Sequence, residues 1–129
     1  MNENEIQLYN NERTIELKSI CEVLMNEVDV HLADATSKLY HGSPVWFIED
    51  NPIVGYDATA DHVNILFWSG QSFIAPGLEA AGKFKAAGTK YFDVSEIDLE
   101  ALRAWLKESV ATQWNYRDLR KNNGELVRW

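Results

Sequence analysis

Two stretches with helical spacing of apolar residues enclose a strand-like middle segment, and this arrangement constrains the fold more than any other feature of the chain. The first helix is expected from about Glu12 to Val28, with one buried face formed by Leu17, Ile20, Cys21, Leu24 and Val28. The second begins near Asp98, a residue type that caps helix N-termini, and is expected to run to about Trp114. Its apolar stripe is Leu99, Leu102, Leu106 and Val110, with Trp105 beside it.

Turn-forming residues divide the middle segment into short strands. Strands are expected at residues 45–48, 53–58, 63–68 and 91–94, with a short one at 72–74, a helical turn or strand at 34–40 and a short helix at 78–81. The predicted fold class is therefore α+β, a two-layer helix–sheet sandwich in which a helix is followed by four to five mostly antiparallel strands and a second helix.

Length and composition indicate one domain. The 129 residues contain no linker or repeat, so residues 1–129 are expected to form a single domain with its core at about 12–114, a flexible N-terminus and a basic, aromatic C-terminal tail. The loose ends are expected at roughly residues 1–10 and 118–129. The only cysteine, Cys21, lies in the first apolar stripe, where a thiol is structural rather than reactive. We expect a cytoplasmic protein, because the sequence starts without a signal-peptide pattern and has no apolar run long enough to span a membrane.

The charge distribution argues against nucleic acid as a partner. The net charge is −8, and residues 1–82 carry 13 acidic and 3 basic side chains. Such an acidic body repels phosphate backbones. The lysines among the glycines at residues 77–90 are interpreted as a surface loop, with a phosphate site as the alternative, and the tail is expected to pack back on the domain or across a homodimer.

Two strands are apolar at consecutive positions, which is unusual for a strand with one exposed face. These runs, 45–48 and 65–68, predict that the second sheet face is also covered, by the 70–88 loop, the tail or a partner chain. Trp46, Trp68 and Trp114 are candidates to line a cleft there for a small ligand or a protein partner, and the alternative is that they are ordinary core residues.

A resemblance to a known family rests on an ordered set of short segments. They are Tyr40–Pro44, Val63–Gly70, Pro76–Leu78, Gly82–Lys83 and Ile97–Asp98, within the stretch from about Asp34 to Val110. In this set the chain resembles the YdhG-like domain family, whose fold is a helix–sheet–helix sandwich. One branch of that family is described as frataxin-like iron chaperones, so the resemblance implies iron as a candidate cargo.

Acidic and histidine side chains offer material for such a metal site, because iron prefers oxygen and imidazole ligands. One group lies where the first helix ends and consists of Glu27, Asp29, His31 and Asp34, with His41 soon after, and Asp29, His31, Asp34 and His41 are the candidate ligands. A second group lies around the strand turns and consists of Glu49, Asp50, Asp57, Asp61 and His62. The sequence has no strict metal-binding or nucleophile motif and identifies no catalytic residue. We therefore expect a non-enzymatic binding module with iron as the candidate cargo, or a small-ligand or protein-interaction module.

Overall fold

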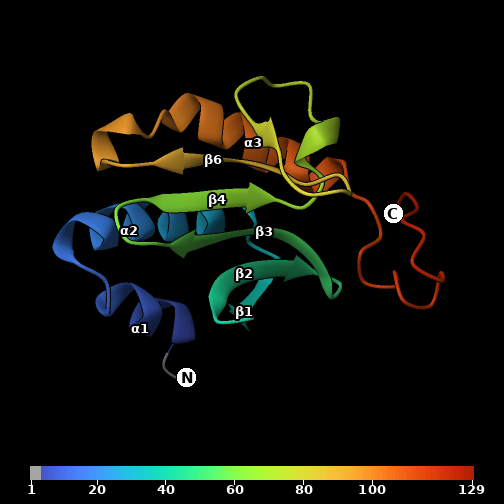
Figure 1. The fold of residues 1–129 in the computed structure, drawn as a ribbon, viewed down its shortest axis with the longest axis horizontal. Coiled ribbons are helices and arrows are strands. Elements are labelled where there is room, and N and C mark those ends of the chain that lie inside the picture. Colours follow the sequence, from blue (N-terminus) through green and yellow to red (C-terminus); the bar gives the residue numbers. More distant parts are fainter. Residues whose placement is uncertain (1–3) are drawn as a thin grey trace.

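Helices cover one face of a six-stranded sheet in the computed structural model, which describes residues 4–129 (Figure 1). The helices are α1 (Glu5–Asn11), α2 (Ile15–His31) and α3 (Leu99–Ala111). The strands are β1 (Thr36–Tyr40), β2 (Ser43–Ile48), β3 (Asn51–Ala58), β4 (Val63–Phe67), β5 (Glu79–Ala80) and β6 (Ala87–Tyr91), with 3-10 turns at Gly70–Ser72 and Val94–Glu96. No helix in this described part of the chain is long and apolar enough to cross a bilayer.

Side-chain caps set the starts of the helices. Thr14 accepts a hydrogen bond from the Leu17 amide at 3.3 Å at the start of α2. Asp98 accepts one from the Ala101 amide at 3.1 Å at the start of α3, as the sequence predicts. Each cap satisfies an amide that has no partner inside the first helical turn.

The sheet is antiparallel throughout, in the strand order β1-β2-β3-β4-β6-β5. In the view of Figure 1, α2 and α3 lie behind the sheet. The core is therefore one layer between the helices and the inward-facing strand residues, with Val54, Ile65 and Phe67 at most 1% exposed. The coarse prediction of an α+β fold with helix, antiparallel sheet and helix in that order is confirmed, whereas the sheet has six strands rather than four or five.

The N-terminal part of the described chain is helical, so the prediction of a loose segment over residues 1–10 is wrong for residues 5–10, and residues 1–3 lie outside the described chain. A buried polar network attaches α1 to the rest of the fold. Tyr56 on β3 donates to the Asn10 side chain at 2.6 Å, and the Asn10 amide reaches Glu22 on α2 at 3.2 Å. Asn10 is fully buried, so these bonds replace the water it would otherwise bind.

Several predicted boundaries also move. Residues 70–72 form a 3-10 turn near the predicted strand at 72–74, the predicted helix at 78–81 contains strand β5, and the last strand occupies 87–91 instead of 91–94. In α3 the buried stripe runs through Leu102, Trp105, Leu106 and Ser109, whereas Leu99 and Val110 of the predicted stripe are 39% and 44% exposed. Trp105 replaces Val110 in the core because its large ring packs against Phe67, with ring centres 6.1 Å apart.

Candidate functional site

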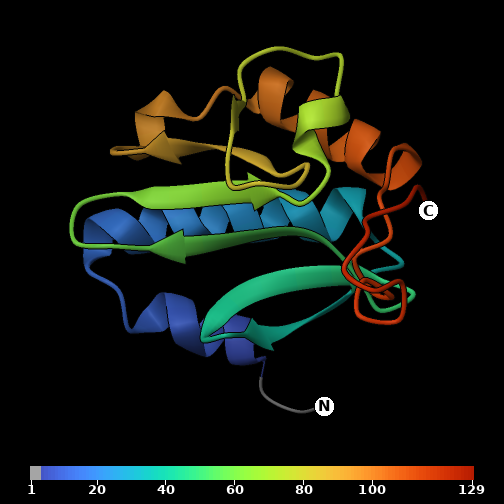
Figure 2. The same cartoon turned by 45° about the vertical axis from the view of Figure 1, so that its right-hand side comes forward.

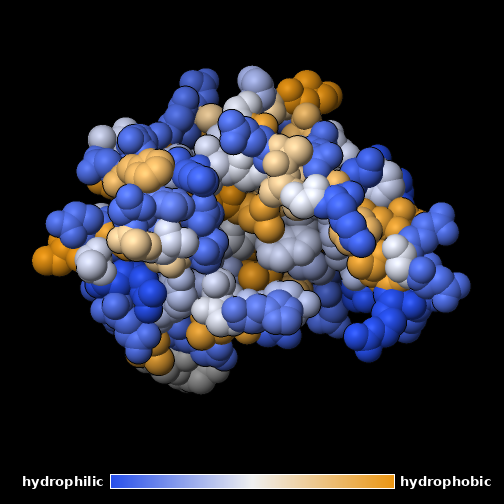
Figure 3. Space-filling model, viewed as in Figure 1, coloured by the Kyte–Doolittle hydropathy of each residue, from blue (hydrophilic) through white to orange (hydrophobic). Residues whose placement is uncertain are grey.

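The sheet face turned away from the helices carries a groove. In Figure 3 this face is hollowed near its middle, with apolar atoms on the floor and mostly hydrophilic residues around it. One hollow of about 220 Å³ is lined by Tyr40, His41, Ser43, Pro44, Val45, Gly55, Tyr56, Asp57, Leu66 and Trp68. An adjoining hollow of about 350 Å³ is lined by Asp57, Asn64, Ile65, Leu66, Glu79, Ala80, Ala81, Gly88, Thr89 and Lys90. Because Asp57 and Leu66 belong to both linings, the two hollows lie side by side, and we call them together the sheet groove.

Two glycines keep the floor of the sheet groove free of side chains. A Cβ at Gly55 would lie 2.6 Å from the Pro44 carbonyl oxygen and 3.4 Å from the Trp68 ring. A Cβ at Gly88 would lie 2.2 Å from the Ile65 carbonyl oxygen. Both distances to oxygen are too short for real contacts, so larger residues at these positions would disturb strand pairing.

Burial along β4 explains the run of apolar residues at 65–68. Ile65 and Phe67 point into the core, whereas Leu66 and Trp68 are half-buried and line the groove. The alternation is thus a normal strand pattern in which the outward positions are apolar. The second face is open over the groove, which differs from the prediction that this face is covered.

Asp57 is the acidic side chain shared by both hollows. It is half-buried, and its one side-chain hydrogen bond within residues 4–129 comes from the Asn64 amide at 3.4 Å. It forms no ion pair in that range. Asp57 also lines a third hollow of about 530 Å³, between α1 and the β1–β2 hairpin. A carboxylate at this junction can accept hydrogen bonds from a ligand in any of the three spaces.

The turn between β1 and β2 forms one rim of the sheet groove. His41 adopts a left-handed backbone conformation with φ 52°, and its ring packs against Tyr40 at an angle of 58°, with ring centres 4.3 Å apart. His41 and Ser43 line the same hollow as Asp57, yet neither side chain makes a hydrogen bond among the described residues. The three residues therefore do not form the hydrogen-bonded chain that activates a serine nucleophile.

The C-terminal tail contacts Trp68, one of the residues that line the sheet groove. Tyr116 donates a hydrogen bond to the Trp68 carbonyl at 2.6 Å, and its hydroxyl accepts one from the Lys85 amide at 3.1 Å. Partial burial raises the pKa of Tyr116, so it stays a neutral donor near neutral pH. The tail lies beside the turn between β2 and β3 (Figure 2).

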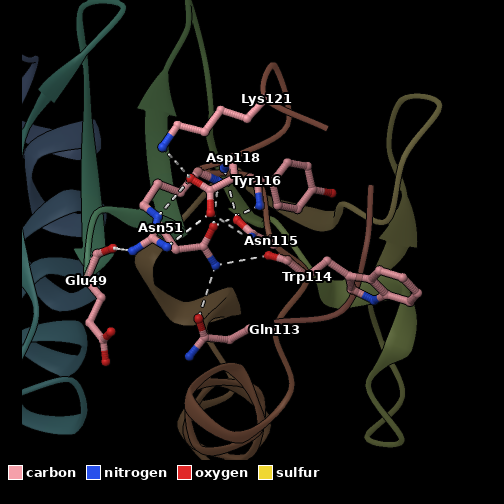
Figure 4. A network of polar contacts seen from close by, with 9 residues as sticks. Glu49, Asn51, Gln113, Trp114, Asn115, Tyr116, Asp118 and Lys121 are labelled. Carbon is pink, nitrogen blue, oxygen red and sulfur yellow. Dashed lines mark hydrogen bonds and ion pairs between the residues drawn. The ribbon is translucent and has the colours of Figure 1, made fainter. Parts of the chain in front are cut away.

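A single buried side chain fixes this tail (Figure 4). The Asn51 amide donates to the Gln113 side chain at 3.1 Å and to the Trp114 carbonyl at 3.0 Å. Its oxygen accepts from the Tyr116 amide at 2.9 Å and the Arg117 amide at 3.0 Å. Asn51 is fully buried, and these four bonds use both of its donor hydrogens and both lone pairs of its oxygen.

Further contacts hold the tail in place, which differs from the prediction that residues 118–129 are loose. Trp114 pairs with Arg128 in a β-bridge, and the guanidinium of Arg117 lies 4.6 Å from the ring centre of Trp129. Arg117 also donates to the Glu49 carbonyl at 3.0 Å. The expectation that aromatic tail residues pack back on the domain is confirmed.

Of the three tryptophans predicted to share a cleft, Trp46 lies on the other side of the sheet from Trp68. Trp46 is 1% exposed on the helix-facing side, and its indole donates to Asp29 at 2.8 Å. Trp68 lines the sheet groove, and Trp114 lies in the tail, where its indole donates to Ser72 at 2.9 Å. A cleft that includes Trp46 is therefore incorrect, because alternate positions along a strand face opposite sides of the sheet.

The residues predicted to hold iron are not brought together. The Asp29 carboxylate accepts a hydrogen bond from the Trp46 indole, and the His31 ring lies within hydrogen-bond distance of the Glu27 carbonyl at 3.0 Å. Asp34 precedes β1 and His41 follows it, and a five-residue strand separates them by roughly 17 Å. Within residues 4–129 no group of three or more His, Cys, Asp or Glu side chains is placed to hold a metal ion. Iron binding by this set stays a prediction from the sequence that the geometry does not support.

Cys21 behaves as the sequence predicts. Its side chain is fully buried in the core, and burial raises the pKa of its thiol to about 12. The reactive thiolate is therefore scarce near neutral pH.

Comparisons with protein-family models, with curated proteins and with solved structures find no match to this chain.

Proposed function

We propose that this chain is a binding module that takes a small, elongated organic molecule into the sheet groove. The observation that carries the proposal is the open hollow of about 350 Å³ beside a second of about 220 Å³, with Asp57 and Leu66 in both linings. Small-molecule sites are typically concave, of roughly 300–1,000 Å³, with an apolar lining and a few placed polar groups. The sheet groove has this composition, with Val45, Leu66 and Trp68 beside Asp57 and Asn64.

Binding fits the site better than a chemical reaction does. A general base acts within hydrogen-bond reach of the group it deprotonates. His41 and Ser43 make no side-chain hydrogen bonds in the described chain, and no pair of groups in the groove is arranged as base and nucleophile there. The rigid floor of paired strands instead suits a preformed pocket.

The resemblance to the YdhG-like family remains part of this proposal. Two of the segments that carry it, Tyr40–Pro44 and Val63–Gly70, supply a rim and part of the floor of the groove. The element order of helix, sheet and helix also agrees with that resemblance. The segments that resemble the family therefore include residues that line the groove.

A neutral fragment tests the proposal. We expect 2-phenylethanol, titrated into ¹⁵N-labelled protein, to shift the amide signals of Gly55, Leu66 and Gly88 together with the Trp68 indole signal. Leu66→Trp fills the floor of the groove and should abolish these shifts. The matched control is Ile15→Trp, because Ile15 is 81% exposed on α2, away from the groove.

The proposal fails if the fragment shifts signals elsewhere and not in the groove. It also fails if Leu66→Trp, shown to be folded by its amide spectrum, leaves the shifts intact.

A further inference from the structure

We infer that the sheet groove selects ligands that carry a protonated amine, held by Asp57, with their apolar part over Gly55 and Leu66. This inference rests on the proposed function and adds the chemical class of the ligand. It comes from the position of Asp57 and the charges around it.

The carboxylate of Asp57 has unused capacity for hydrogen bonds. It lies at the junction of three hollows and accepts one long side-chain bond, from Asn64 at 3.4 Å. A carboxylate offers about four acceptor sites. An ammonium has three donor hydrogens and no acceptor, so it matches this group, whereas a carboxylate ligand would be repelled.

The surrounding charges favour a cation. The smaller hollow contains no lysine or arginine, and Asp57 is its acidic residue. The hollow beside α1 adds Glu5 and Glu12, and its Arg13 lies over the Tyr9 ring at 4.3 Å and 3.5 Å from Glu12. In the larger hollow Lys90 is accompanied by Glu79, so the groove as a whole is acidic.

Aromatic rings complete the environment of the amine. Tyr40 and Trp68 line the same hollow as Asp57. The face of an aromatic ring attracts a cation, and the attraction grows when water is excluded. Carboxylate, rings and apolar floor together fit an amine attached to an apolar body.

A series of three probes with the same body tests this selectivity. Phenethylammonium, 2-phenylethanol and 3-phenylpropionate carry a positive, a neutral and a negative group on a phenylalkyl chain. We expect phenethylammonium to bind the groove about tenfold more tightly than the alcohol, because one charge-assisted hydrogen bond strengthens binding by about that factor. The carboxylate should bind more weakly than both.

Asp57→Asn removes the charge and keeps the shape and one oxygen. It should weaken phenethylammonium binding about tenfold and leave 2-phenylethanol unchanged. Asp34→Asn is the matched control, because it removes the same charge at an exposed turn outside the groove and should change neither probe.

The outcomes separate the inference from the proposed function. If the alcohol binds the groove and the ammonium binds no more tightly in the natural chain, the inference is refuted and the binding function stands. Equal effects of Asp57→Asn and Asp34→Asn also refute it, because the charge would then act only through the overall field. If no probe shifts the groove signals, the proposed function itself fails.

Discussion

Replacing Asn51 by alanine should be among the most damaging single changes in the chain. The side chain is fully buried and makes four hydrogen bonds. Two go to Gln113 and Trp114, and two come from the amides of Tyr116 and Arg117. Each such bond contributes about 1 kcal/mol net, and a buried partner left without one costs more. Because three of the four partners, in Trp114, Tyr116 and Arg117, are only partly buried and can regain water, we expect Asn51→Ala to lower the free energy of unfolding by about 2–4 kcal/mol.

Urea unfolding followed by tryptophan fluorescence measures this loss. Asn26→Ala is the control, because Asn26 is exposed on α2 and should change stability by less than about 0.5 kcal/mol. Hydrogen exchange gives the location: the amides of Tyr116 and Arg117 should lose protection well before those of α2. If Asn51→Ala unfolds within about 0.5 kcal/mol of the natural chain, or if those two amides keep their protection, Asn51 does not hold the tail.

Three further changes test other buried or paired groups. Tyr56→Phe removes the bond to the buried Asn10 side chain and should cost about 1–2 kcal/mol by urea unfolding, and a neutral effect would contradict the network at α1. Burial raises the pKa of Cys21 from 9.0 to about 12. The contribution of the protonated thiol to the free energy of unfolding is therefore complete below pH 9 and is lost as pH rises toward 12. Stability of the natural chain should therefore fall between pH 9 and 10 more steeply than that of Cys21→Ala, and equal slopes would refute the shift. A hydrogen bond from Arg103 lowers the pKa of Glu27. This pair therefore stabilises the folded chain above pH 4.5, and its stabilising effect is lost as pH falls below that value. Arg103→Gln should lower the free energy of unfolding only slightly at pH 7, because water screens this surface ion pair, and the difference should shrink in acid.

The sequence predicted elements where periodicity was strong. The α2 stripe is right because Leu17, Ile20, Cys21, Leu24 and Val28 all face the core. Helix α1 was missed because its seven residues bury only Ile6 and a polar residue, Asn10, so no apolar period is visible. An asparagine before Glu5 was the remaining signal, since Asn4 caps the helix by accepting from the Ile6 amide at 2.8 Å.

The site was harder to predict than the fold. The apolar run at 65–68 showed that both faces of β4 carry apolar side chains, and it could not show that one face stays open around Leu66. Trp46 and Trp68 look alike in sequence, and only the register of β2 and β3 places Trp46 on the core side. Asp57 is one of 20 acidic residues, and the sequence does not distinguish it from the others. Only the structure shows that it lines three hollows.

The hydrogen bond from Tyr116 to Trp68 has a consequence for how the chain is made. The two residues are 48 positions apart, so the hydroxyl reaches its carbonyl partner only after β5, β6 and α3 have been synthesised. A ribosome-bound nascent chain that ends before the tail would therefore hold Trp68 without this partner. The backbone next to Trp68 would gain this contact only when most of the domain has already been made.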